Sequence, residues 1–193
     1  MLFRVHSAAV FGINACPVSV EIDLSFGDKL NLMTVGLPDA AVRESGQRVK
    51  SALRNCGFML PKQHITINLA PADLRKEGTA FDLPMAVGIL GATKVLRTSD
   101  LSSFLFMGEL SLDGQVRPVK GALSAAAMAR EKGLRNLIVP EANALEAAVV
   151  EGIRAFPVCN LLQVVELLNR EKLLMPTEVD RRKMLEEIGR AHV

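Results

Sequence analysis

The sequence contains no tryptophan and no tyrosine, and its eight phenylalanines are its only aromatic residues. Proteins stack the bases of single-stranded nucleic acids on aromatic side chains, so this absence removes most of the usual platforms for a single strand. The net charge is also small, at +2 for 193 residues. Any affinity for nucleic acid must therefore come from a local basic patch, because the charge of the whole chain is too low to supply it.

Cysteine and histidine are scarce as well. The three residues of each kind are scattered along the chain: Cys16, Cys56, Cys159, His6, His64 and His192. The cysteines are odd in number and form no C-x-x-C pair, which excludes the usual zinc and redox motifs. We therefore expect a chain that folds without disulfides in a reduced, cytoplasmic setting and holds no metal.

No long apolar run is present. The longest, "LPMAVGILGA", has about half of the ~20 residues that a membrane-spanning helix needs. The N-terminal stretch includes Arg4 and His6 and alternates polar with apolar residues, so it reads as a strand and not as a signal peptide. We expect no contact with a membrane. The 49% of apolar residues nevertheless suffices for a sizeable core.

The sequence also lacks the motifs of a nucleotide site. No G-x-x-x-x-G-K-[ST] pattern, whose backbone N–H groups would hold phosphates, occurs in the chain. The glycine-containing stretch "RKEGTAFD" carries Glu77 and Asp82, which would repel an anion. We therefore expect no nucleotide or other cofactor in this chain.

What is present predicts a mixed fold. Alternation predicts a hairpin over 2–11 and 17–25 and further strands at 31–37 and 64–70, and helical spacing predicts a helix over 40–56 with Gly57 at its end. After these come an apolar helix over about 80–95, a hairpin around Asp113-Gly114, and alternating helices and strands that end in a helix over 160–174. This order predicts an α+β or mixed α/β domain around one sheet.

Two caps and a tail complete these expectations. Asp82 is expected to cap the apolar helix, with Pro84 in its first turn, and Asn160 to cap the last helix. Residues 176–193 are charged, with few apolar positions, and read as a linker or a loosely docked helix.

Basic residues gather in three places. The helix over 40–56 carries a row at spacings of four, three and four, with one further arginine beside it: Arg43, Gln47, Lys50 and Arg54, and Arg48. The alternative is a solvated face on which Glu44 pairs with Arg48. The other two clusters are Arg75-Lys76 and the pair Arg117 and Lys120. Three basic clusters on a nearly neutral chain indicate an anionic or acidic partner.

Three long motifs resemble a known family. They are "TVGLPDAAVRESGQRVKSAL", "ITINLAPADLRKEGTAFDLPMAVGIL" and "FMGELSLDGQVRPVKGAL". In this order they are similar to the N-terminal domain of the bacterial magnesium-chelatase-like AAA+ ATPases, the YifB or ComM group. The resemblance covers residues 1 to about 175 and implies that 176–193 lead toward an AAA+ module.

The resemblance also implies the fold and the state of one site. This domain type is similar to the proteolytic domain of Lon and to the C-terminal domain of RadA, which share the ribosomal protein S5 domain 2-like fold. The serine of the Lon dyad falls on Ala80 and its lysine on or near Leu123, so both positions are apolar here. Lys120 is close by but has no serine at position 80. The resemblance therefore implies a degenerate, non-catalytic protease site.

For function, the resemblance implies a parent that binds ATP and Mg²⁺, assembles as a hexameric ring and acts on DNA, as ComM does in branch migration. This chain would contribute ring contacts or DNA contacts. The residues expected to contact DNA or another partner are Arg43, Arg48, Lys50, Arg54, Arg75 and Lys76. Two alternatives remain open, a protein-interaction module of a chelatase-type chaperone and a Lon-type peptidase with a displaced nucleophile.

Overall fold

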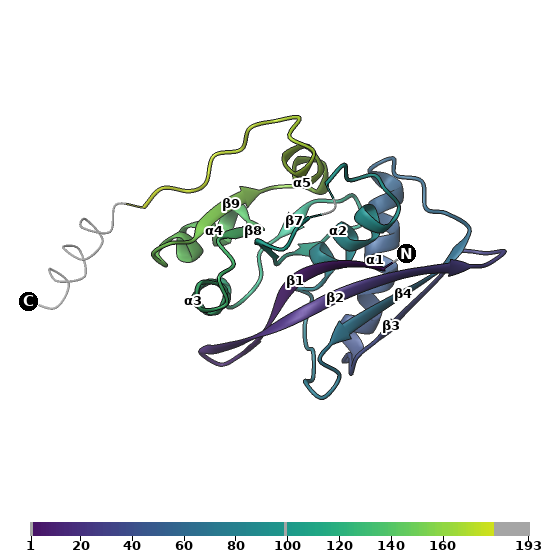
Figure 1. The fold of residues 1–193 in the computed structure, drawn as a ribbon, viewed down its shortest axis with the longest axis horizontal. Coiled ribbons are helices and arrows are strands. Elements are labelled where there is room, and N and C mark those ends of the chain that lie inside the picture. Colours follow the sequence, from purple (N-terminus) through teal and green to yellow (C-terminus); the bar gives the residue numbers. More distant parts are fainter. Residues whose placement is uncertain (1, 99, 180–193) are drawn as a thin grey trace, which may run out of the picture.

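A seven-stranded sheet in the order β3-β4-β2-β1-β5-β8-β9 organises the protein (Figure 1). The structure, a computed structural model, describes residues 2–98 and 100–179. The strands of the sheet are β1 (Leu2–Phe11), β2 (Asn14–Phe26), β3 (Asn31–Val35), β4 (Gln63–Ala70), β5 (Phe104–Phe106), β8 (Asn136–Pro140) and β9 (Arg154–Val158). A separate two-stranded sheet consists of β6 (Glu109–Leu110) and β7 (Val116–Arg117). The helices are α1 (Ala40–Asn55), α2 (Asp82–Ala92), α3 (Ala122–Glu131), α4 (Glu141–Ala148) and α5 (Leu161–Leu168). The predicted mixed α/β class is confirmed.

The first half of the sheet is built on the long β1–β2 hairpin, which the sequence predicts. The two strands pair antiparallel over all ten residues of β1, β4 pairs antiparallel with β2, and β3 pairs parallel with β4. Their alternation places polar residues on one face. There Glu21 accepts hydrogen bonds from Arg4 of β1 and Asn68 of β4, both at 2.9 Å, and so links three strands.

The second half consists of the parallel strands β5, β8 and β9. All five residues of β8 are buried, as expected of a parallel strand with helices on both faces. The predicted hairpin around Asp113-Gly114 is confirmed, but its strands are short. The Asp113-Gly114 turn joins only the two-residue strands β6 and β7, whereas β5 belongs to the main sheet.

Two apolar cores lie on opposite faces of the sheet. The larger core packs α1, α2 and α5 against one face. The smaller core packs α3 and α4 against the other face of β5, β8 and β9 and against the adjoining end of the β1–β2 hairpin. Every residue of α2 is buried, which confirms the prediction of a central helix. Pro84 lies in its first turn, where a missing N–H costs no helical hydrogen bond.

The helix ends follow the predictions in α1 but only in part elsewhere. Asp39 caps α1 by accepting from the Val42 N–H at 2.7 Å, and Gly57 takes a φ of +85° after its end. The prediction that Asp82 caps α2 is wrong. Phe81 occupies the cap position without a side-chain bond, and the Asp82 carboxylate turns toward α1 and β6.

Asn160 caps α5 as predicted, by accepting from the Gln163 N–H at 2.9 Å. The helix ends at Leu168 and not near residue 174, because the chain leaves helical geometry at Arg170, whose φ is +58°. The predicted boundary at residue 175 stays a prediction, and most of 176–193 lies outside the described residues. Within the part of the chain that the structure describes, no helix has the length and apolar character needed to cross a membrane.

Candidate functional site

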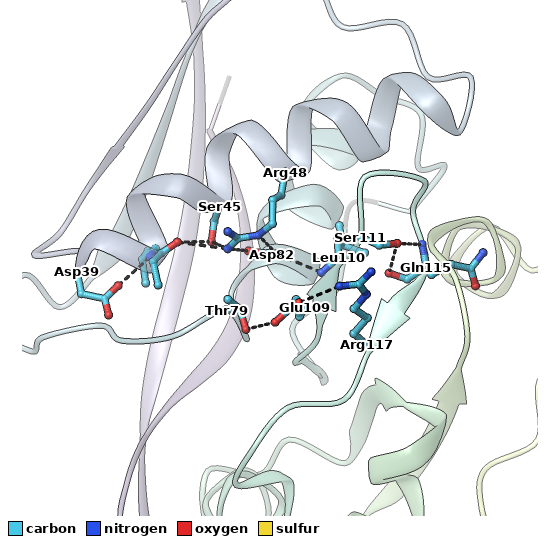
Figure 2. Close-up of polar contacts among 12 residues, drawn as sticks. Asp39, Ser45, Arg48, Thr79, Asp82, Glu109, Leu110, Ser111, Gln115 and Arg117 are labelled. Carbon is cyan, nitrogen blue, oxygen red and sulfur yellow. Dashed lines mark hydrogen bonds and ion pairs between the residues drawn. The ribbon is translucent and has the colours of Figure 1, made fainter.

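Arg48 and Asp82 form a buried ion pair between α1 and α2 (Figure 2). The guanidinium donates from Nε to Asp82 Oδ2 at 2.8 Å and from Nη2 to Oδ1 at 3.1 Å, a two-pronged geometry that suits arginine. Asp82 also accepts from the Leu110 N–H at 3.1 Å, so one carboxylate joins α1, α2 and β6. The Asp82 side chain is fully buried, whereas that of Arg48 is 23% exposed.

This pair changes the role expected of Arg48. Burial raises the pKa of the Asp82 carboxyl, and the bonds from Arg48 and the Leu110 N–H oppose that rise. The bond to Asp82 also raises the pKa of Arg48. Glu44, the alternative partner, makes no ion pair with Arg48 within residues 2–98 and 100–179. The Arg48 side chain therefore points into the interior and does not belong to the exposed basic row of α1.

Lys76 is also not on the surface, which corrects the prediction that it joins an exposed basic cluster. Its side chain is fully buried, and its Nζ donates to the Pro71 carbonyl. Its backbone accepts from the Asp39 N–H at 3.0 Å and donates to the Leu37 carbonyl at 3.2 Å. Burial lowers the pKa of Lys76. Lys76 thus fastens the 75–79 loop to the start of α1.

The exposed cations that remain lie on α1. Arg43 and Arg54 are exposed and Lys50 is half-buried. Among the described residues no ion pair uses Lys50 or Arg54, whereas Arg43 donates to the Pro38 carbonyl at 3.0 Å. Lys50 and Arg54 line a hollow of about 530 Å³. We call Arg43, Lys50 and Arg54 the α1 row.

The second predicted cluster is weaker than the sequence indicates. Arg75 is exposed but pairs with Glu77 at 3.0 Å, so its charge is largely balanced. The Gly78 N–H donates to Asp39 at 3.2 Å, which places the 75–79 loop beside the N-terminus of α1. Of the Arg75-Lys76 cluster, only Arg75 is exposed and can extend the basic surface of the α1 row.

A cleft of about 750 Å³ opens on the other side of this loop. Its lining comes from β1, the 77–80 loop and the chain before α3: Ala8, Val10, Gly12, Glu77, Gly78, Thr79, Ala80, Met107, Glu109, Pro118, Val119 and Lys120. Thr79 donates its hydroxyl to Glu109, and Arg117 lies 3.7 Å from the other oxygen of that carboxylate, as Figure 2 shows. Polar side chains therefore mark the rim of a cleft with an apolar floor.

The two positions of the degenerate dyad do not meet. Ala80 lines this cleft, whereas Leu123 is 48% exposed and lines a separate hollow with Leu145, Glu146 and Val149. Lys120, three residues before Leu123, is the lysine that reaches the cleft. The cleft thus holds a methyl group at position 80 and an ammonium group beside it.

Sequence reasoning left Thr79 and Glu109 out of the site and placed Lys120 in a basic cluster with Arg117. Glu109 is 30 residues from Thr79, and no local spacing announces that contact. The structure also places no group of three or more histidine, cysteine or acidic residues together as a metal site, within the residues that it describes.

The seven-stranded mixed sheet with helices on both faces defines a mixed α/β domain. Comparison with known families agrees. The chain belongs to the family described as subunit ChlI of Mg-chelatase, whose sequence profile matches residues 20–143.

Several relatives are similar over most of this chain. The competence protein ComM of Haemophilus influenzae is 46% identical over 176 residues, 91% of this chain and 34% of that protein. The uncharacterized protein YifB of Escherichia coli is 39% identical over 191 residues, 96% of this chain and 37% of YifB. Lon protease 2 of Bacillus subtilis is more distant, 24% identical over 90% of this chain and 34% of that protease. The chain thus spans about a third of the length of these relatives.

Proposed function

We propose that this chain is the non-proteolytic N-terminal module of a ComM/YifB-type protein and that its α1 row contacts the backbone of DNA. The observation that carries the proposal is the set of unbalanced cations on one helix face, Arg43, Lys50 and Arg54. Phosphates are the natural partners of such a row, since arginine and lysine supply most backbone contacts to nucleic acids. Contacts of this kind carry no sequence preference.

The fold supports this use of α1. The Arg48–Asp82 pair holds α1 against α2, and Asp39 caps its N-terminus. The α1 row therefore lies on a helix whose position is fixed by these contacts. The hollow beside Lys50 and Arg54 gives a phosphate-bearing strand room to approach two cations at once. The lack of tryptophan and tyrosine favours duplex backbone over stacked single-strand bases.

In this proposal, ATP and Mg²⁺ are bound by the part of the longer protein that this chain does not span. The sequence offers no phosphate-binding loop of the G-x-x-x-x-G-K-[ST] type. The full protein would form a hexameric ring in the cytoplasm, and a ring would multiply weak contacts from each module.

A Lon-type peptidase is a poorer account of the cleft. A hydroxyl nucleophile needs a base within hydrogen-bond reach. Ala80 has no hydroxyl, and the Thr79 hydroxyl donates to Glu109, whose carboxylate also faces Arg117. A carboxylate is in general a far weaker base than an amine or imidazole. We therefore expect no peptide cleavage by this chain.

The test is a salt titration of fluorescent duplex and forked DNA against the wild-type chain and a triple variant, Arg43→Glu, Lys50→Glu and Arg54→Glu. Wild-type affinity should be near the ~10⁻⁴ to 10⁻⁶ M of non-specific sites and should fall steeply with salt. The triple variant should bind all sequences more weakly and with a flatter salt dependence.

A control carries the same change of charge elsewhere, at the exposed residues Arg130, Lys132 and Arg135. This control should bind as the wild type does. Equal affinities and slopes for the wild type and the α1 variant would rule out the α1 row as the DNA site. Retention of an acidic protein but not of DNA by the α1 row would favour the protein-interaction function instead.

A further inference from the structure

The cleft beside Thr79 lies where the two halves of the sheet meet. β1 pairs with β5 through a single bridge, His6 with Leu105, and the Ser7 hydroxyl donates to the Phe106 carbonyl at 2.9 Å. Beyond that point β5 ends, and the next two residues bond to other segments, Met107 N–H to the Ile138 carbonyl and Gly108 N–H to the Ala80 carbonyl. Among the described residues, β2 is then the only strand that pairs with Ala8–Phe11.

On that side β1 therefore has no partner strand among the described residues, and its edge reaches the surface from Val10 onward. In an antiparallel pair, every second residue directs its backbone N–H and C=O away from its partner strand. The edge is buried at Ala8 and Ala9, half-buried at Val10 and exposed from Phe11 onward. It thus runs from the floor of the cleft to the tip of the hairpin, where Ile13 is 89% exposed.

The floor of the cleft is apolar. Ala8, Ala80 and Met107 line its inner end, and Val10 and Val119 line the side nearer the hairpin tip. All five of these residues belong to, or pack against, the core under α3 and α4, so this floor is held in place. A floor of this kind suits one apolar side chain.

The charges of the rim are balanced with one exception. Glu109 is engaged by Thr79 and Arg117, and Glu77 pairs with Arg75. Lys120 lines the cleft but takes part in no ion pair within the described residues. The next residue, Gly121, lies so close to Val10 that a Cβ there would come within 2.5 Å of that side chain, which fixes Lys120 beside the open edge.

From this edge, floor and charge we infer that the cleft binds an extended polypeptide segment that adds to the free edge of β1. An apolar side chain of the segment fills the floor formed by Ala8, Ala80 and Met107, and an acidic side chain two residues away meets Lys120. Residues two apart on a strand share a face, as Ala8 and Val10 do, so both groups point to the same side. Binding is main-chain pairing with side-chain selection, and no bond of the segment is broken.

The segment need not end in the cleft. The edge continues past Phe11 to the exposed turn at Gly12 and Ile13, so the bound chain leaves into solvent at the hairpin tip. This favours an internal acidic side chain over a terminal carboxylate as the group that Lys120 meets. The site is separate from the α1 row and does not depend on the proposed DNA contact.

The test uses a fluorescein-labelled hexapeptide, Ser-Leu-Thr-Glu-Thr-Gly, with capped ends and the 193-residue chain. Anisotropy should report saturable binding, and the backbone amides of Val10, Phe11 and Lys120 should shift in NMR spectra. Replacing the glutamate of the peptide by glutamine should weaken binding roughly threefold to fivefold, as expected of an exposed ion pair. Methylating the peptide nitrogens, which removes their hydrogen-bond donors, should abolish binding.

Variants of the protein separate this proposal from non-specific attraction. Lys120→Glu should weaken binding of the glutamate peptide and favour a peptide with lysine in that place, whereas Lys132→Glu, at the exposed end of α3, should bind as the wild type does. No binding at millimolar peptide, or equal binding by the wild type and Lys120→Glu, would overturn the proposal. Amide shifts confined to α1 would overturn it as well.

Discussion

The two halves of the sheet differ in which faces of their strands are buried. In the first half, the strands alternate, as β4 does, with one face on the core and the other carrying polar residues such as Glu21. In the second half, helices pack on both faces, and β8 is buried throughout. The two halves meet between β1 and β5, which pair parallel through one bridge.

That junction is narrow. The strands of the two halves are connected by one bridge and by the Ser7–Phe106 hydrogen bond. The apolar core around α2 also connects the two halves, because it packs against strands of both. The comparison indicates why a cleft opens there. β1 extends past the end of its neighbour β5, so the backbone edge of its last residues has no partner strand among the described residues.

The largest effect is expected from Met85→Asp in α2, which should unfold both halves together. Met85 is fully buried, and an unpaired buried carboxylate costs several kcal/mol of the ~5 to 15 kcal/mol that stabilise a typical domain. Circular dichroism reports the loss of structure in the whole chain, and amide exchange in β4 and in β8 reports each half separately. Leu123→Asp, at an exposed site, is the control and should stay folded. A Met85→Asp variant that loses protection in only one half would show that the halves are independent.

A smaller loss of stability is expected from Asp82→Ala. This change leaves Arg48 without its carboxylate and the Leu110 N–H without its acceptor, and removing one partner of a buried pair costs about 3 to 5 kcal/mol. Because Arg48 is partly exposed, we expect the lower end of that range in urea unfolding.

The double replacement Arg48→Met with Asp82→Leu should recover much of that loss, since it leaves no buried charge. Arg4→Ala, which breaks the exposed Arg4–Glu21 pair, is the matched control and should cost less than about 1 kcal/mol. If Asp82→Ala cost no more than Arg4→Ala, the Arg48–Asp82 pair would not stabilise the contact between α1 and α2.

The junction itself can be tested with Ser7→Ala. The Ser7 side chain is fully buried, and its loss leaves the Phe106 carbonyl without that donor, which should cost about 1 to 3 kcal/mol. Ser25→Ala, at an exposed position of β2, should change the free energy of unfolding by less than about 0.5 kcal/mol. Equal stability of the two variants would mean that the core alone joins the halves.

The sequence predicts elements where one local pattern decides them. Alternation predicts the β1–β2 hairpin, and the apolar run predicts the buried α2. Local capping chemistry likewise predicts Asn160 at the start of α5. These signals survive in the fold because the tertiary contacts reinforce each of them.

The site is less predictable because it depends on contacts between distant segments. Helix spacing places Arg48 beside an exposed row, and a charged loop places Lys76 on the surface. In the structure Arg48 turns inward to Asp82, and Lys76 turns inward to the Pro71 carbonyl. Asp82 is a plausible cap by sequence, yet an arginine 34 residues away and the backbone of Leu110 compete for its carboxylate. The cleft, too, exists only because β1 extends past β5.

The smallest effect concerns pH and lies at the same junction, at His6. Burial and the charge of Arg4 lower the pKa of His6 from its ordinary value of 6.5. As the pH falls below 6.5, the unfolded chain therefore takes up a proton at His6 before the folded chain does, and the stability that His6 contributes at higher pH is progressively lost. His6→Gln should match the wild type near pH 8, apart from a constant offset, and should lose less stability between pH 7 and 5.5. Urea unfolding across that window measures the difference, and identical pH slopes for the two proteins would show that the β1–β5 junction does not disfavour a charged His6.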